Sequence, residues 1–320
     1  MAFDSGSIPQ PVLDELFAEH RATFDQFIYR RPELFPVKPV NVTKGTAPVM
    51  ELQQGRVGAV NPSRATRVAK GQPTPKGNSE MSTRPYVIKH DKWAEGLNEI
   101  TAVEAEEYTM ELEEILKDRC GFNVLTTKEL DLEALLKGQG VADEGTDVQT
   151  RILGTTEKFN YYGTVGNDWV DYSDVDAIIT KMVRDSGGGN VCIMGRDVAD
   201  ALRRHPQLTS RNAGQGVEII GYDELLDNLM GMGLDRVIIG RHYYHDGSRE
   251  VAYDQAEFFS GTFAVFRPGA IKRFIQSGRD LRYDSFDDID TEDTYLRARE
   301  SSNFWVPIPE NVQVLTTILG

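Results

Sequence analysis

Cysteine is the residue that this chain lacks most clearly, with only two among 320 residues. Two cysteines cannot build the disulfide framework of a small secreted domain, nor a zinc site made of several thiolates. Cys120 lies at the end of a predicted helix and Cys192 lies inside a predicted strand. We therefore expect both thiols to be reduced, buried and unpaired.

Long apolar runs are missing as well. No stretch of about eighteen apolar residues occurs, so the sequence predicts no helix that crosses a bilayer. The first residues, MAFDSGSIPQPVLDELF, have no basic start, no apolar segment and no small-residue cleavage site, which argues against a secretory signal peptide. The composition is that of a soluble globular protein, long enough for one large domain or two ordinary ones. We expect the protein to act where it is made, or in something assembled there.

The sequence also lacks the glycine pattern of nucleotide-binding enzymes. The stretch NVCIMGRDVADALRRHP, residues 190–206, reads as a strand, a turn and a helix, and RVIIGRHYYHDG repeats the strand-Gly-Arg pattern at residues 236–247. A phosphate site at such a turn needs several glycines whose backbone amides face the ligand, and only Gly195 follows the first strand. No Gly-Lys dipeptide occurs, which excludes a P-loop. Both turns are therefore expected to serve packing.

Candidate metal and catalytic groups do not converge. His242, His245 and Asp246 form the densest cluster, but two histidines three positions apart point to opposite faces of a strand. The acidic run DSFDDIDTED, residues 284–293, lacks the glycine of an EF-hand calcium loop. The signatures of serine hydrolases and zinc proteases are absent too. The sequence therefore predicts a non-catalytic protein without a metal or cofactor.

Charge is abundant but unevenly distributed. The formal net charge of −15 argues against a general nucleic-acid binder, because phosphate contacts need clustered Lys and Arg. Residues 54–90 nevertheless carry many basic side chains and a single acidic one, Glu80. A Glu-rich segment follows at residues 97–120, and residues 280–293 are acidic again. Such a separation predicts contacts between oppositely charged surfaces.

The first half of the chain alternates between helical and extended patterns. Residues 12–28 carry an apolar stripe at helical spacing, and the proline-rich RRPELFPVKPVNV after them must run extended. Residues 54–90 hold two β-prone flanks, RVGAV and RPYVIKH, around a turn-rich centre, so a long projecting hairpin and a disordered linker are the alternatives. Residues 97–120 predict a long amphipathic helix ending at Gly121, before a short helix, LDLEALLKG, and a hairpin, VADEGTDVQTRIL.

From Tyr172 the pattern changes to alternating helices and strands, which is typical of one compact α/β domain on a small sheet. SDVDAIITKMVRDSGGG opens with Ser173 as the expected N-cap and Asp176 three residues later, a capping-box pattern. We expect strands at NVCIM, VEII, RVIIG and TFAVF, and helices at RDVADALRRH and YDELLDNLMGM. The final NVQVLTTIL is expected to form a closing strand.

The order of these parts resembles the major capsid protein of tailed phages, the Hong Kong 97-type fold. The resemblance spans nearly the whole chain and rests on order and spacing, because no short motif of this family is diagnostic alone. The segments that carry it are RPYVIKHDKWAEGLNEITAVEAEEYTMELEEILKDRC, NVCIMGRDVADALRRHPQL, and LDRVIIGRHYYHDG followed by EFFSGTFAVFRPG.

The resemblance implies an α+β capsid fold in five parts. These are an N-terminal arm (1–53), an extended β-hairpin loop (54–90), a peripheral domain with a long spine helix (91–172), an α/β axial domain (173–267) and a return to the peripheral domain (268–320). It further implies hexamers and pentamers that close into an icosahedral phage head in the virion, assembled in the host cytoplasm around double-stranded DNA. A portal protein is the implied partner; scaffolding, protease and decoration proteins stay open, DNA is enclosed non-specifically, and no membrane is involved.

Two other functions remain as alternatives. Encapsulin-type nanocompartment shells share the fold and enclose cargo enzymes, and an α/β nucleotide-binding enzyme is a more remote possibility. For the capsid function, the charge separation predicts an assembly interface in which the basic loop of one subunit lies on an acidic surface of the next. The predicted interface residues are Arg56, Arg64, Arg67, Lys70, Lys76, Arg84, Glu104, Glu106, Glu107 and Glu111.

Overall fold

The computed structural model describes most of the chain, and the described segments fall into two compact units. The described residues are 27–50, 81–97, 112–161, 173–211, 219–240, 243–245, 255–287 and 294–319. Unit 1 comprises Met1–Gly45, Val87–Leu132 and Lys272–Phe304, and unit 2 comprises Thr46–Tyr86, Glu133–Ile271 and Trp305–Gly320. Each unit is therefore built from segments that are far apart in the sequence.

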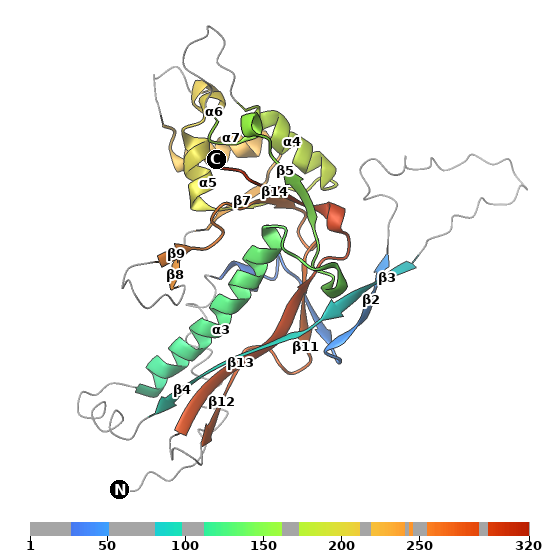
Figure 1. Cartoon of the computed structure of the whole chain (residues 1–320), viewed down its shortest axis with the longest axis vertical. Helices are drawn as coiled ribbons and strands as arrows, with labels where there is room; N and C mark the ends of the chain where they lie inside the picture. Colours follow the sequence, from blue (N-terminus) through green and yellow to red (C-terminus); the bar gives the residue numbers. More distant parts are fainter. Residues whose placement is uncertain are drawn as a thin grey trace, which may run out of the picture. The chain divides into compact units, whose positions relative to one another are not determined.

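Unit 1 is built on a five-stranded sheet with one long strand at its centre. Its strands are β1 (Val37–Val40), β4 (Lys89–Leu97), β11 (Lys272–Gln276), β12 (Arg282–Asp287) and β13 (Thr294–Trp305). The order is β1-β11-β13-β12, and β4 also pairs with β13. The central strand β13 runs antiparallel to both β4 and β12 (Figure 1). Leu296, Ala298 and Glu300 are buried at alternate positions along β13, which is the pattern of a sheet with one covered face.

Helix α3 (Leu112–Leu136) packs on this covered face, where the Cys120 thiol donates to the carbonyl oxygen of Leu296 at 3.4 Å. The sequence predicted a helix over residues 97–120 that ends at Gly121, and this prediction is wrong at its end. The helix continues through Gly121 and includes the segment expected to form a separate short helix. A glycine inside a helix costs only about 1 kcal/mol relative to alanine, and the burial of the following turn outweighs that cost.

The structure replaces both predicted boundaries of the long helix. Leu97, the expected start, is instead the last residue of strand β4, and residues 98–111 lie outside the described residues. At the other end Gly138 has a φ of 76°, in the left-handed region that favours glycine, and the amide of Gln139 donates to the carbonyl of Ala134. The glycine that ends the helix is therefore Gly138.

The proline-rich segment near the N-terminus forms part of unit 1. Strand β1 pairs in parallel with β11, so the segment is extended there, as predicted. Residues 32–34 form a turn instead, and a short 3-10 helix, η1 (Ile28–Arg30), precedes them. The side chains of Phe27, Leu34 and Phe35 are buried, which fixes the segment by burial of apolar surface. Residues 12–26 of the predicted helix lie outside the described residues.

Unit 2 is built on a second five-stranded sheet, in the order β5-β14-β10-β6-β7. Its strands are β5 (Gln149–Ile152), β6 (Val191–Met194), β7 (Arg236–Ile239), β10 (Phe263–Phe266) and β14 (Val312–Thr316). The pairs β6–β7 and β14–β5 run parallel, whereas β10 is antiparallel to both of its neighbours. The strands predicted at NVCIM, RVIIG, TFAVF and NVQVLTTIL are therefore confirmed.

Helices pack on the unit 2 sheet and complete its core (Figure 1). They are α4 (Val175–Asp185), α5 (Arg196–Arg203), α6 (Pro206–Arg211) and α7 (Tyr222–Gly231). Side chains such as Ile179, Leu202 and Leu225 come from three of these helices and are fully buried in one cluster with Cys192 of β6. The helices predicted after NVCIM and at YDELLDNLMGM are confirmed.

Three local predictions in unit 2 are wrong. Asp174, not Ser173, caps α4, because its carboxylate accepts the amide of Ala177 at 3.1 Å. A strand was predicted at VEII, but the described residues of this segment lie outside any strand. Ile220 is apolar because its side chain is buried in the core. The segment VADEGTDVQTRIL forms no hairpin, since β5 pairs with β14 instead of with its own flank.

Two short strand pairs and three further 3-10 turns complete the described elements. β2 (Lys44–Met50) pairs with β3 (Met81–Val87), and β8 (Tyr243–His245) pairs with β9 (Gln255–Glu257). The predicted flank RPYVIKH of the extended loop is thus divided between β3 and β4, whereas the flank RVGAV lies outside the described residues. The 3-10 turns are η2 (Ala142–Glu144), η3 (Thr155–Glu157) and η5 (Pro309–Asn311).

Both cysteines are buried and free, as predicted, although Cys120 lies inside α3 and not at a helix end. Burial raises the pKa of the Cys120 thiol to about 11, and the charge of Glu95 adds to the effect. Burial alone raises the pKa of Cys192. Within the described ranges no helix is both long and apolar enough to span a membrane.

Candidate assembly interface

Most of the residues predicted to form an assembly interface lie outside the described residues. These are Arg56, Arg64, Arg67, Lys70, Lys76, Glu104, Glu106, Glu107 and Glu111. Arg84 lies on β3 in unit 2, where its guanidinium forms an ion pair with Asp147. It also donates to the carbonyl oxygen of Pro307 at 3.5 Å. Within one subunit Arg84 therefore fixes β3 to unit 2, and the part of all ten residues in assembly stays a prediction.

A close backbone contact next to Arg84 holds the same strand. The indole nitrogen of Trp305 donates to the carbonyl oxygen of Pro85 at 3.1 Å, and the amide of Val306 donates to the carbonyl of Gly145 at 2.8 Å. Gly145 has a φ of 71°, and a β-carbon there would lie 2.2 Å from the carbonyl oxygen of Pro85. Only glycine lets the two backbones come this close. The strand that leads out of the predicted extended loop is thus fixed within unit 2.

The two strand-Gly-Arg turns are packing contacts. A β-carbon at Gly195 would lie 2.3 Å from the carbonyl oxygen of Phe259, and one at Gly240 would lie 2.6 Å from that of Phe258. Both glycines therefore allow the ends of β6 and β7 to approach the same short stretch of backbone. This explains why a glycine follows both strands.

The start of α5, where a nucleotide-binding enzyme would hold phosphate, is occupied by the chain itself. The carboxylate of Asp197 accepts the hydroxyl of Ser260 at 2.9 Å and the amide of Gly261 at 2.8 Å. A carboxylate at this position stabilises the helix N-terminus, as a bound phosphate would. The turn thus favours the packing interpretation over the enzyme alternative.

Ser173, just before α4, and His205, just before α6, form a buried pair that no local pattern predicts, because they are 32 positions apart. His205 is fully buried, and its Nε2 lies 2.9 Å from the Ser173 hydroxyl. The other ring nitrogen, Nδ1, accepts the backbone amide of Gln207 at 3.3 Å, so Nε2 carries the proton. An imidazole in this tautomer donates to the serine and cannot take its proton. The pair is therefore a structural contact and not an activated nucleophile.

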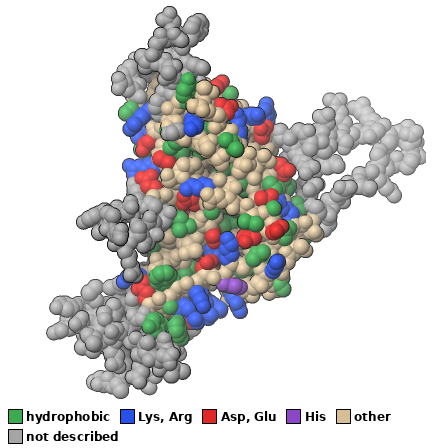
Figure 2. Space-filling model, in the orientation of Figure 1, with side chains coloured by type: hydrophobic (Ala, Val, Ile, Leu, Met, Phe, Trp, Pro, Cys, Tyr) green, Lys and Arg blue, Asp and Glu red, His purple; other side chains and the backbone are tan. Residues whose placement is uncertain are grey.

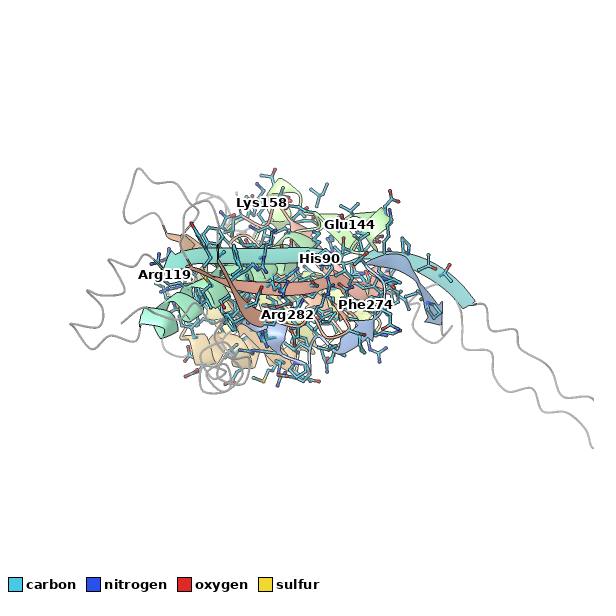
Figure 3. The ribbon with its side chains drawn as sticks, turned by 90° about the horizontal axis from the view of Figure 1, so that it is seen from below. His90, Arg119, Glu144, Lys158, Phe274 and Arg282 are labelled. Atoms are coloured by element: carbon cyan, nitrogen blue, oxygen red, sulfur yellow. The ribbon has the colours of Figure 1, made fainter. Side chains whose placement is uncertain are left out.

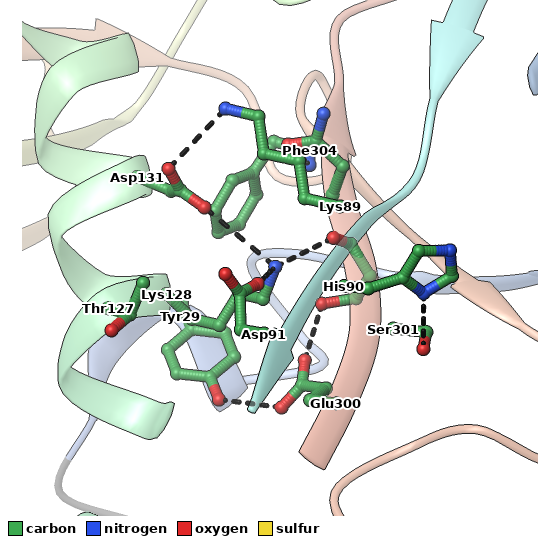
Figure 4. A network of polar contacts seen from close by, with 12 residues as sticks. Tyr29, Lys89, His90, Asp91, Thr127, Lys128, Asp131, Glu300, Ser301 and Phe304 are labelled. Atoms are coloured by element: carbon green, nitrogen blue, oxygen red, sulfur yellow. Dashed lines mark hydrogen bonds and ion pairs between the residues drawn. The ribbon is translucent and has the colours of Figure 1, made fainter. Parts of the chain in front are cut away.

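A network of buried polar side chains holds the N-terminal segment in unit 1 (Figure 4). The carboxylate of Glu129 on α3 accepts the backbone amides of Ile28 and Tyr29, each at 3.0 Å. The Tyr29 hydroxyl donates to Glu300 on β13 at 3.0 Å. Burial raises the pKa of Tyr29 well above its usual value, and the charge of Glu300 raises it further. Helix, sheet and N-terminal segment are thus joined by hydrogen bonds that are sheltered from water.

The same network contains a lysine that is fully buried (Figure 4). Lys128 on α3 forms an ion pair with Asp91 on β4 and donates to the carbonyl oxygen of Ser302 on β13 at 2.8 Å. Asp131, one turn further along the helix, lies 3.8 Å from the same amino group. A buried charge is tolerated only when it is paired and hydrogen-bonded, so Lys128 fixes α3 to two neighbouring strands.

No convergent metal site occurs in the described part of the chain, where no three His, Cys, Asp or Glu side chains could hold an ion. Of the histidine cluster weighed from the sequence, only His245 is described, on β8, while His242 and Asp246 are not. The described residues thus offer hydrogen bonds and ion pairs that fix the fold, and no group of side chains arranged for catalysis.

Known proteins resemble this chain in structure but not detectably in sequence. No protein-family model and no curated protein matches it. A phage-related protein from Bordetella bronchiseptica is 15% identical, with a TM-score of 0.62 over 98% of each chain. The mature capsid of bacteriophage PhiM1 is 11% identical, with a TM-score of 0.50 over 92% of this chain and 88% of that chain. A virus-like particle from Pyrococcus furiosus is 10% identical, with a TM-score of 0.50 over 95% of this chain and 99% of that chain.

At such low identities the similarity shows the fold alone. The chain has the mixed α+β fold of phage capsid proteins, and the fold class predicted from the order of the sequence segments is confirmed. The match extends over nearly the whole of each chain, so it includes both units and not one common domain.

Replacing Gly145 by alanine should destabilise unit 2 by about 2–5 kcal/mol, because left-handed strain adds to the clash with Pro85. Gly278→Ala is the matched control, since Gly278 has the same φ of 71° but nothing within 4 Å of its added β-carbon. The control should lose only the strain contribution, about 1–2 kcal/mol. Urea unfolding of both variants measures the difference. If both variants lose the same free energy of unfolding, β3 moves away from the added methyl group at no cost.

The stability of unit 2 should fall as the solution is acidified, through His205. Burial lowers the pKa of His205 from its ordinary value of 6.5 to about 4. Between pH 6.5 and 4 the unfolded chain therefore binds a proton that the folded chain does not, so stability is lost as pH falls through this window. The loss should reach at most about 3 kcal/mol.

The measurement compares urea unfolding of the wild type and His205→Gln at pH 7 and pH 4.5. Glutamine keeps a side-chain N–H for Ser173 but does not titrate. The wild type should lose more stability than the variant between the two pH values. Identical pH dependence in both proteins would show that His205 is protonated equally in the folded and unfolded states.

Proposed function

We propose that this protein is the major capsid protein of a tailed phage, a structural subunit that associates with itself into a closed shell. The observation that supports the proposal most directly is the whole-chain similarity to a bacteriophage capsid, which covers 92% of this chain and 88% of the other. A catalytic function has no such support from any group of described side chains. On this proposal the protein acts in the virion and is not an enzyme.

The proposal includes the finer features that the resemblance implies. Subunits form hexamers and pentamers, and the icosahedral shell encloses double-stranded DNA without reading its sequence. A portal protein occupies one position in the shell. The net charge of −15 supports enclosure without tight binding, because an acidic surface repels phosphate.

A cargo-enclosing nanocompartment is the second candidate function. It is favoured by the similarity to the virus-like particle from Pyrococcus furiosus, which covers 95% of this chain. The two functions predict the same closed shell and differ in its contents. DNA in particles isolated from the native source would favour the phage head, whereas a co-purifying enzyme would favour the nanocompartment.

Expression of the full chain should yield closed particles or ring-shaped capsomers. The reason is that a shell subunit reaches its most stable state only when its neighbours cover its interfaces. The smallest icosahedral shell, with sixty copies of a 35.8 kDa chain, would have a mass of about 2 MDa. Size-exclusion chromatography with negative-stain microscopy makes the measurement. A stable monomer at high protein concentration would contradict the proposal.

The charge separation supports a specific contact between neighbouring subunits. We expect the basic loop, residues 54–90, to lie on the Glu-rich segment of the next subunit, residues 97–120. Exposed ion pairs contribute only about 0.2–1 kcal/mol each, but several per subunit recur at every contact in a shell. Reversal of Arg56, Arg64 and Arg67 to Glu should therefore weaken assembly, most strongly at low salt.

The control for this contact is a compensating reversal. Changing Glu106, Glu107 and Glu111 to Lys in the same chain should restore part of the lost assembly, because opposite charges would face each other again. Light scattering at several salt concentrations follows assembly. If the first reversal assembles as well as the wild type at every salt concentration, the loop charges serve solubility alone, and the capsid function is unaffected.

A further inference from the structure

One face of the unit 1 sheet is basic although the chain as a whole is acidic. Helix α3 covers the other face, where it forms ion pairs with Asp91 and Glu95 of β4. Because side chains alternate along a strand, His90, Lys92 and Ala94 point away from α3. Figure 2 shows Lys and Arg side chains gathered over β4, β13 and β12, beside a histidine, and Figure 3 labels His90 and Arg282 on this sheet.

Three cations stand side by side on this face. The strand register places Lys92 opposite Arg299, and Arg299 opposite Arg282. We call these three residues the basic row. Like charges directly opposite one another on neighbouring strands repel, so the row costs stability in the isolated subunit. Packing of the sheet therefore does not account for the basic row.

The nearest carboxylate does not neutralise the row. Asp284 forms an ion pair with Arg297 and lies 3.1 Å from the Nε of Arg299, so one acid serves two cations. Arg282 forms no ion pair with any described residue, and its Nε has no hydrogen-bond partner among them. Burial and then the charges of Arg299 and Arg279 lower the pKa of Arg282, which reflects an excess of positive charge.

An acidic run follows strand β12 in the sequence. Residues 287–293 carry five acids, which are Asp287, Asp288, Asp290, Glu292 and Asp293. The connection begins where Asp287 pairs with Thr294, and the Arg282–Arg299 pair lies five residues further along the strands, about 17 Å away. Asp287, the described acid of this run, therefore lies too far along the strand to neutralise the row.

We propose that the basic row of one subunit binds the acidic run, residues 287–293, of a second copy of this chain. Arg282 and Arg299 of the row lie on β12 and β13, and the acidic run connects these two strands in the sequence, so every copy offers one of each. Such a contact is heterologous, and it closes into a ring when the rotation between copies allows it. The inference rests on the proposed self-assembly and names one surface that it uses.

Protein and not nucleic acid is the favoured occupant. Three cations would neutralise only about three phosphates, which gives weak and strongly salt-dependent binding to DNA. The chain's net charge of −15 opposes such binding further, whereas it ensures that a neighbouring copy is rich in carboxylates. The five acids of the run also outnumber the three cations of the row.

The first test is a disulfide between copies. Chains carrying Lys92→Cys are mixed with chains carrying Asp290→Cys during assembly, and the particles are oxidised. We expect a covalent dimer on a non-reducing gel, at least about tenfold above the wild type, whose own thiols are buried. The matched control pairs Asp290→Cys with Lys181→Cys, an exposed position on α4 in unit 2. A dimer yield no higher than that control overturns the proposal.

The second test separates the contact from subunit stability. Lys92→Glu with Arg282→Glu places two acids beside Arg299, so the fold should be at least as stable as the wild type, while the concentration needed for assembly rises about tenfold. Lys181→Glu with Arg267→Glu makes the same change of charge at exposed positions of unit 2 and should leave assembly unchanged. Asp288→Lys with Asp290→Lys should restore assembly of the first variant.

The outcomes distinguish this contact from the general function. If the wild type forms no particles, the proposed function fails and the contact fails with it. If the wild type assembles but the row variant behaves like its control, the contact alone is wrong. Loss of DNA retention at low salt in the row variant, with assembly unchanged, would make the row a nucleic-acid surface and would also overturn the proposal.

Discussion

Strand β13 pairs with β4 from Thr294 opposite Leu97 to Ser302 opposite Lys89, and the rest of unit 1 depends on this register. It brings Asp91 under α3, where the buried amino group of Lys128 requires a carboxylate. An unpaired charge in this position would cost several kcal/mol, so the docked helix needs the two distant strands to be joined in this register. The sheet and the buried polar network therefore form together, which favours a cooperative unit over a set of separable parts.

The same register decides what each face of the sheet can do. A one-residue slip would turn Asp91 away from α3 and bring Lys92 inward, which would leave Lys128 facing another cation. The inner face is thus fixed by a charge that must be paired, and the outer face receives the row of three cations as a consequence. The repulsion in that row is small beside the pairing inside, because exposed charges are screened by water and salt. The subunit can therefore present an unneutralised surface to a neighbour without losing its fold.

Residues that look alike in the sequence have different structural roles, and these roles depend on what each residue contacts in the fold. Gly121 and Gly138 both look like helix ends, but Gly121 precedes a buried turn and continues the helix, whereas Gly138 adopts a left-handed φ and ends it. The apolar run around Ile220 looks like a strand because it fills the core from a loop. The charge clusters of the assembly interface could be chosen from composition, yet their placement depends on contacts between subunits that one chain does not contain.

The sequence by itself determined the class of fold, because the order of extended segments, long helix and α/β repeats survives errors of several residues at each boundary. It also determined that both cysteines are buried and that the strand-Gly-Arg turns serve packing, since these follow from local pattern and the absence of further glycines. The tertiary structure decided everything that depends on register. The meeting of Ser173 with His205, the closeness of Gly145 to Pro85, and the alignment of Lys92 with Arg299 each join residues that no local periodicity relates. The hydrophobic pattern of a strand predicts which of its faces is covered, whereas the pairing of strands decides which residues contact one another on that face.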